Sequence, residues 1–252
     1  MSKIAIIGGT GLTSLNNLNI IRREIVQTPY GEPSGPLTYG EICGTEVIFL
    51  ARHGYGHTIP PHKVNYQANI WALHQAGASY IIAVNAVGGI TTQFKPATLS
   101  IPDQLIDYTY SRNNTYFEES LTQVVHIDFT EPYCDKLRHF ILSQANINNI
   151  EIINSATYAV TQGPRLESAA EINKLEKDGC DIVGMTGMPE TALARELDLC
   201  YASIAVVANF AAGKSNSFIT MDIIETNLTE GMIKVKKILE AVIPDILSGI
   251  KN

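Results

Sequence analysis

Apolar and polar residues alternate along the chain in two patterns. Short apolar runs, typical of buried strands, occupy residues 3–7, 46–51, 79–84 and 201–208. Between these runs, apolar residues recur with helical spacing over 63–77, 132–146, 169–178, 189–197 and 221–247. Because strands and helices alternate with no repeat or linker between them, the pattern predicts one α/β domain over residues 1–252.

Within the stretch 161–213, strand-type and helix-type patterns follow one another closely. A short apolar run at 181–183 is followed by a loop, a helix and the apolar strand 201–208, an order that predicts a parallel pair of strands. In open parallel sheets, ligands bind beyond the carboxyl ends of the strands. That rule points to Met185, Thr186 and Asn209 as candidate binding residues.

Other strand ends carry groups that bind anions. Glycines surround Thr10 after the first strand, Arg52 and His53 follow the second arm of a predicted hairpin (37–51), and paired glycines close the segment 85–89. Adjacent glycines let backbone N–H groups approach an anion, and a guanidinium can pair with it. One shared pocket explains these strand ends best, with a ligand-free turn or a solvated Arg as the alternatives at each.

Composition narrows the class of partner. Apolar residues make up 45% of the chain and charged residues 17%, and the net charge is −7. An acidic chain is unsuited to nucleic acid or an anionic membrane, and no apolar run approaches the ~20 residues that cross a bilayer. The amino terminus lacks the pattern of a signal peptide, so we expect a cytoplasmic protein whose four cysteines are reduced thiols.

The sequence gives little support for a metal site or for a dinucleotide-dependent oxidoreductase. His53, His57 and His62 cluster, but prolines and glycines interrupt them and no acidic or Cys ligand lies among them, so we expect no metal. A dinucleotide-dependent oxidoreductase would need G-x-G-x-x-G after the first strand. Ser14 occupies the position of the third small residue, which argues against that class.

Six segments together resemble the trimeric purine nucleoside phosphorylase family, and within it the methylthioadenosine phosphorylase branch. They read IIGGTGL (6–12), ARHG (51–54), KVNYQANIWAL (63–73), NAVGG (85–89), GPRLE (163–167) and GMTGMPE (184–190). The resemblance implies a single domain with a central mixed, largely parallel sheet flanked by helices. It also implies a homotrimer that cleaves a nucleoside with inorganic phosphate as co-substrate and needs no metal or organic cofactor.

The resemblance also assigns roles to residues. Those expected to hold phosphate are Thr10, Arg52, His53, Ala86 (through its backbone) and Thr186. Asn85 would contribute to substrate binding, Met185 would lie under the ribose, and His126 would reach the 5′ end of the sugar across a trimer interface.

The base pocket departs from that of the 6-aminopurine enzymes. By resemblance, these carry an acid at the positions of Asn209 and Ala211 and a small hydroxyl residue at that of Glu167. An Asn amide can donate to a 6-carbonyl and N7, and a carboxylate can accept the N1–H that adenine lacks. We therefore expect a 6-oxopurine, with Asn209, Glu167 and His53 as catalytic residues; an ordinary helix-start acid is the alternative for Glu167.

The 5′ end suggests a thioether. Where ordinary 6-oxopurine enzymes of the family place a His, this chain aligns Met221, with Ile224 one turn further on. Apolar groups suit a methylthio group and would leave a hydroxyl without a partner, unless Met221 only fills the core. The combination predicts S-methyl-5′-thioinosine. Inosine or guanosine, then methylthioadenosine, remain alternatives, as does a non-catalytic nucleoside-binding protein.

Overall fold

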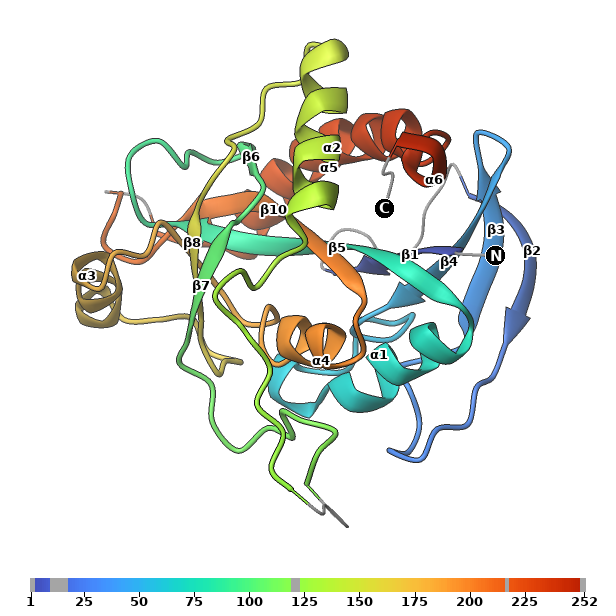
Figure 1. Cartoon of the computed structure of the whole chain (residues 1–252). Helices are drawn as coiled ribbons and strands as arrows, with labels where there is room; N and C mark the ends of the chain where they lie inside the picture. The colour runs from blue at the N-terminus through green and yellow to red at the C-terminus, as the bar shows by residue number, and fades with distance from the viewer. Residues whose placement is uncertain (1–2, 10–17, 119–122, 216–217, 250–252) are drawn as a thin grey trace.

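A ten-stranded mixed sheet runs through the molecule (Figure 1). The computed structural model describes residues 3–9, 18–118, 123–215 and 218–249. Hydrogen-bonded neighbours follow the order β2-β3-β4-β1-β5-β9-β8-β7, and β10 pairs with both β5 and β6. The strands are β1 (Lys3–Gly8), β2 (Asn19–Glu24), β3 (Leu37–Ile42), β4 (Thr45–Ala51), β5 (Ala78–Gly89), β6 (Leu99–Ser100), β7 (Gln104–Asp107), β8 (Thr157–Val160), β9 (Ile182–Gly184) and β10 (Cys200–Phe210).

Helices cover both faces of the sheet, which confirms the predicted α/β class. α2 (Asp135–Ile147), α5 (Met221–Val242) and α6 (Ile246–Gly249) lie on one face, and α1 (Tyr66–Gln75) and α4 (Glu190–Glu196) on the other (Figure 1). Residues of β1 alternate between the two cores: Ile4 and Ile6 pack toward α5, and Ala5 and Ile7 toward α1. α3 (Ala169–Lys177) lies at one end of the sheet, and a 3-10 turn, η1 (Pro61–Lys63), precedes α1.

The helix predicted over 221–247 is interrupted. α5 ends at Val242, and α6 begins only at Ile246. Pro244 lies between them, and a proline ring removes a backbone donor and blocks the preceding turn of a helix. Among the helices of the described residues, none is long and apolar enough to cross a bilayer.

The central strand is β5, and its neighbours change along its length. Its first half pairs in parallel with β1, and β10 runs parallel to it throughout. At Gly88 and Gly89, β9 pairs with it in the antiparallel sense. The predicted parallel pairing of 181–183 with 201–208 is therefore wrong, because β9 and β10 both pair with β5 and run in opposite directions.

Both long strands continue past their predicted ends, and this shapes the site. β5 includes the segment 85–89, and β10 includes Asn209 and Phe210. The register between β10 and β5 shifts between Val207 and Asn209, so Ala208 is an extra residue on the β10 side. A bulge of this kind re-aims the side chains that follow it.

A disulfide corrects the expectation that all four cysteines are reduced. Cys134 and Cys200, 66 residues apart in sequence, are bonded, whereas Cys43 and Cys180 are free. The bond joins the residue before α2 to the first residue of β10. Sequence spacing could not identify the pair, because it forms only when the helix packs on the sheet.

Loss of this disulfide should destabilise the protein. A crosslink that closes a loop of this length restricts the unfolded chain and contributes about 2–4 kcal/mol. We expect Cys134→Ser/Cys200→Ser, or the reduced parent protein, to unfold in urea with a free energy lower by about that amount. Cys43→Ser, which removes an exposed free thiol, is the matched control. Equal stability of the reduced and oxidised parent would contradict the prediction.

Candidate active site

A cavity of about 520 Å³ opens at the ends of four strands. Its walls come from the loop after β4, the ends of β5, β9 and β10, the segment before α3 and the start of α5. Small-molecule sites usually have volumes of ~300–1,000 Å³, so the cavity suits a metabolite of nucleoside size. The lining residues are Arg52, His53, His57, Thr58, Ile59, Pro60, Pro61, Ala86, Val87, Gly88, Pro164, Leu166, Glu167, Val183, Gly184, Met185, Thr186, Ala208, Asn209, Ala211, Ala212, Ile219, Met221 and Ile224.

Ten of the thirteen predicted site residues line this cavity. They are Arg52, His53, Ala86, Glu167, Met185, Thr186, Asn209, Ala211, Met221 and Ile224. Of the other three, Asn85 is 1% exposed and lies behind the wall, and His126 is exposed on the segment between β7 and α2. Thr10 lies outside the described residues.

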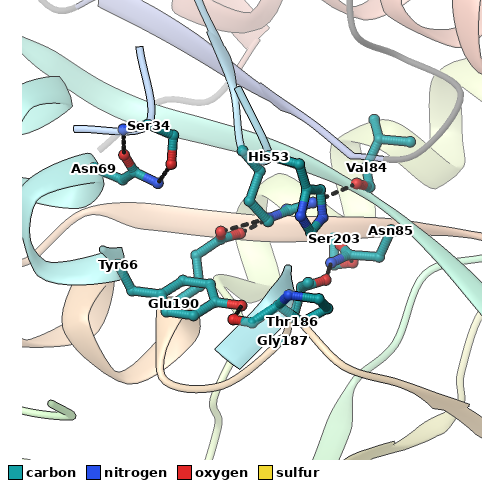
Figure 2. Close-up of polar contacts among 12 residues, drawn as sticks. Ser34, His53, Tyr66, Asn69, Val84, Asn85, Thr186, Gly187, Glu190 and Ser203 are labelled. Atoms are coloured by element: carbon teal, nitrogen blue, oxygen red, sulfur yellow. Dashed lines mark hydrogen bonds and ion pairs between the residues drawn. The ribbon is translucent and has the colours of Figure 1, made fainter. Parts of the chain in front are cut away.

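Arg52 is held by a partner that the sequence did not reveal. Its Nε and Nη2 donate to the two carboxylate oxygens of Glu190 at 2.7 and 2.8 Å, and its Nη1 donates to the Val84 carbonyl. Dashed lines at the labelled Glu190 and Val84 mark these contacts in Figure 2. Both side chains of the ion pair are 0% exposed. Burial by itself lowers the pKa of Arg52, but the charge and hydrogen bonds of Glu190 outweigh burial and raise it, so the guanidinium stays charged. A bidentate pair also fixes the plane of the guanidinium.

Asn85 orients a cavity residue instead of lining the cavity. Its Nδ2 donates to Thr186 Oγ1 at 2.8 Å, and its Oδ1 accepts from the Ser203 hydroxyl at 2.7 Å (Figure 2). Because Thr186 Oγ1 accepts this bond, its own hydroxyl proton can be donated to a ligand. Asn85 thus holds the Thr186 hydroxyl in place, and its role in substrate binding stays a prediction.

His53 has one ring nitrogen committed to the backbone. Its Nδ1 lies 2.8 Å from the Ile59 carbonyl oxygen, which can only accept, so Nδ1 carries a proton. Burial, and then the charge of Arg52, lower the pKa of His53 to about 4, which makes the ring neutral at pH 7. In this tautomer Nε2 is an acceptor.

The neutral state of His53 should appear in the pH dependence of stability. Its folded pKa of about 4 lies below the ordinary value of 6.5, so as the pH falls from 6.5 toward 4 the unfolded chain binds a proton that the folded chain does not. Stability is therefore lost over this window. We expect His53→Gln to lose less unfolding free energy than the parent between pH 7 and pH 5. His139→Gln, at an exposed site, serves as the control, and equal losses in the parent and His53→Gln would contradict the assignment.

Two other lining residues, Glu167 and Asn209, supply complementary polar groups. Glu167 Oε1 accepts from the Thr161 hydroxyl at 2.6 Å. Asn209 Nδ2 uses one N–H on the Phe210 carbonyl, which leaves a second N–H and the amide oxygen. The site thus offers a carboxylate acceptor and an amide that can donate and accept.

Glu167 is not the acid that starts α3. Ser168 is the N-cap, and the reciprocal bonds of the capping box are made by Glu171. The alternative that Glu167 serves only the helix start is therefore wrong. Its carboxylate is held instead on the cavity wall by Thr161.

Three further lining residues are apolar. Ile219 lies just before α5, Met221 and Ile224 lie in its first turn, and Met221 is 62% exposed. The alternative that Met221 only fills the core is therefore wrong. Ile219 was missed because it lies in the irregular segment before the helix, where no periodicity marks it.

The histidine cluster does not form a metal centre in the part of the chain that the structure describes. There, no group of three His, Cys, Asp or Glu side chains is arranged to hold an ion. His53 and His57 instead lie ring against ring, with centroids 4.6 Å apart.

Comparison with known proteins agrees with this arrangement. Residues 3–244 match the Phosphorylase superfamily. The chain is 54% identical to a probable S-methyl-5′-thioinosine phosphorylase of Pseudomonas syringae pv. tomato, over 96% of this chain and 99% of the relative. It is 46% identical to the 6-oxopurine nucleoside phosphorylase of Pyrococcus furiosus, over 96% of this chain and 92% of the relative.

Among solved structures, a methylthioadenosine phosphorylase from Schistosoma mansoni in complex with adenine superimposes with a TM-score of 0.94 at 32% identity. The match covers 98% of this chain and 93% of that one. The predicted fold and family resemblance are both confirmed: the chain belongs to the phosphorylase superfamily.

Proposed function

We propose that this protein cleaves S-methyl-5′-thioinosine with inorganic phosphate, giving hypoxanthine and 5-methylthioribose 1-phosphate in purine salvage. The observation that carries the proposal is that Glu167 and Asn209 line the same cavity as Arg52, His53 and Thr186. The name of the Pseudomonas syringae relative supports it.

The base end of the cavity favours hypoxanthine. Glu167 accepts the N1–H of a 6-oxopurine, and the spare N–H of Asn209 donates to O6 or N7. Adenine would set its N1 lone pair against the carboxylate. Each such mismatch leaves a buried polar group unpaired, at ~1–3 kcal/mol.

The phosphate end supplies donors and one acceptor. Arg52, the Thr186 hydroxyl, the backbone of Ala86 and the side chain of Thr10 hold the anion in this proposal. Because Nδ1 of His53 is bonded to Ile59, Nε2 accepts the single proton of hydrogen phosphate. Phosphate oxygens are thereby aimed at the anomeric carbon.

Phosphorolysis then follows from this alignment. As the glycosidic bond breaks, positive charge develops on the sugar and the phosphate anion stabilises it before attacking C1′. Negative charge moves onto the leaving purine, where the Asn209 amide stabilises it at N7. Met185 forms the surface under the ribose. No step needs a metal or organic cofactor.

The apolar end selects the 5′ substituent. Ile219, Met221 and Ile224 accommodate a methylthio group and provide no partner for a hydroxyl. A homotrimer in which His126 of a neighbouring subunit closes this end, and a cytoplasmic location, belong to the same proposal. The partners are then the nucleoside and phosphate, without nucleic acid or membrane.

A second candidate is a general 6-oxopurine nucleoside phosphorylase that acts on inosine or guanosine. The Pyrococcus furiosus relative favours it, because it is 46% identical and carries that name. The exposed position of Met221 also leaves room for a 5′-hydroxyl to reach water.

A phosphorus NMR experiment tests the reaction itself. The protein is incubated with S-methyl-5′-thioinosine with and without inorganic phosphate, and hypoxanthine is measured in parallel. We expect a new sugar phosphate signal that grows in step with hypoxanthine and only when phosphate is present. Release of hypoxanthine without phosphate would show hydrolysis instead, and binding without any turnover would indicate a non-catalytic protein.

A further inference from the structure

Arg112 makes a set of hydrogen bonds that the reaction chemistry does not explain. It lies in the segment between β7 and α2 and is half-buried. Its Nη1 donates to the Met185 and Met188 carbonyls at 2.9 and 2.6 Å. Its Nη2 donates to the Gln162 and Thr161 carbonyls at 2.9 and 3.3 Å, and Nε donates to Gln162 Oε1.

These acceptors belong to two different loops of the site. One loop, residues 161–167, carries Thr161 and the carboxylate of Glu167 that it holds. The other, residues 184–188, carries Met185 and Thr186. Arg112 therefore joins the loop proposed to bind the base to the loop proposed to bind ribose and phosphate.

The two loops also touch directly, since the Thr161 N–H donates to the Gly184 carbonyl at 2.8 Å. Gly163 has φ +63°, and a Cβ placed there would lie 2.4 Å from Met185 Sδ. A side chain at residue 163 would displace the side chain of Met185. The guanidinium of Arg112 adds hydrogen bonds to the backbone of both loops.

Besides these loops, Arg112 contacts Tyr66 of α1: its Nη1 lies 3.5 Å from the Tyr66 hydroxyl, and its guanidinium lies 5.5 Å from the centre of the ring. In the described ranges no carboxylate lies within 4 Å of it to form an ion pair. The planar fork of an Arg can serve acceptors in two loops at once, whereas the compact ammonium of a Lys cannot span them. Such an arrangement sets geometry more than it stabilises charge.

We propose that Arg112 is a positioning residue that fixes the distance between Glu167 and the phosphate-binding end of the cavity. The inference rests on the proposed phosphorolysis and adds to it a residue outside the cavity wall. Cleavage requires the purine and the phosphate to be aligned on either side of C1′, and a misplacement of ~1 Å can lower the rate by ~10²-fold.

The test compares Arg112→Ala and Arg112→Lys with the parent, using whichever nucleoside the parent cleaves. We expect kcat/KM for the nucleoside to fall about 100-fold in both variants. The KM for phosphate should stay within threefold of the parent value, because Arg52 and Thr186 keep their own partners. Added guanidinium ion should restore Arg112→Ala at least tenfold.

Arg195→Ala is the matched control, since that Arg also donates to a backbone carbonyl but lies exposed on α4, and parent kinetics are expected. Activity of Arg112→Ala within threefold of the parent would overturn the proposal. Equally weakened binding of phosphate and nucleoside, without rescue by guanidinium, would also overturn it, because this result would indicate a general loss of structure. If the parent cleaves only another nucleoside, the proposed substrate fails while the Arg112 comparison stands.

Discussion

Glu167→Ala should lower kcat/KM for S-methyl-5′-thioinosine by about 10–150-fold, which corresponds to the ~1.5–3 kcal/mol of a hydrogen bond to a charged group. The variant leaves the purine N1–H without the carboxylate that Thr161 holds on the cavity wall. Activity with methylthioadenosine, which has no N1–H, should fall much less. Steady-state kinetics with both nucleosides at saturating phosphate measure the change.

The control for this prediction is Glu171→Ala, four residues away. Glu171 completes the capping box of α3 and pairs with the exposed Arg165, so its loss affects the helix start but not the cavity. We expect the preference between the two nucleosides to be unchanged in that variant. If Glu167→Ala lowered kcat/KM equally for both nucleosides, the carboxylate would not distinguish the two purine bases.

Glu190→Gln should lower the free energy of unfolding by about 3–5 kcal/mol, the cost of leaving one charge of a buried pair uncompensated. Arg52 and Glu190 are both fully buried, and the Tyr201 hydroxyl also donates to Glu190 at 2.7 Å. Since a protein of this kind is stable by only ~5–15 kcal/mol, the variant should unfold at a clearly lower urea concentration.

An exposed ion pair provides the comparison. Arg22 and Glu24 are each 50% exposed, and Glu24→Gln should change stability by no more than ~1 kcal/mol. The double variant Arg52→Met/Glu190→Leu removes both buried charges and should recover much of the lost stability. Its KM for phosphate should be higher than that of the parent, because Arg52 is proposed to hold the anion. A Glu190→Gln variant as stable as Glu24→Gln would contradict the burial argument.

The strand ends could be predicted from sequence because their signals are local. An apolar run followed by glycine, or by Arg52 and His53, marks a strand that ends at a binding site. Because ligands bind beyond the carboxyl ends of parallel strands, these ends can be assigned to one site without knowing which strands pair. The cavity brings these residues together as that rule requires. Periodicity could not predict the antiparallel pairing of β9 with β5, which depends on how strands distant in sequence meet.

The partners that hold the site in place carried no local signal. Arg52 and Glu190 are 138 residues apart, and Glu190 alone is indistinguishable from an ordinary acid in the first turn of α4. Arg112 lies in an irregular segment, and its contacts depend on two other loops. The same holds for Asn85, whose side chain faces Thr186 and Ser203 from a strand that was expected to have ended.

The most direct test of the proposed function is the ratio of kcat/KM values for S-methyl-5′-thioinosine, methylthioadenosine, inosine and guanosine, measured with phosphate in one assay. We expect the kcat/KM for S-methyl-5′-thioinosine to exceed each of the other values by at least tenfold, or ~1.4 kcal/mol of transition-state preference. Inosine or guanosine at an equal rate would contradict the role given to Met221 and Ile224. A preference for methylthioadenosine would contradict the proposal that Glu167 and Asn209 select a 6-oxopurine.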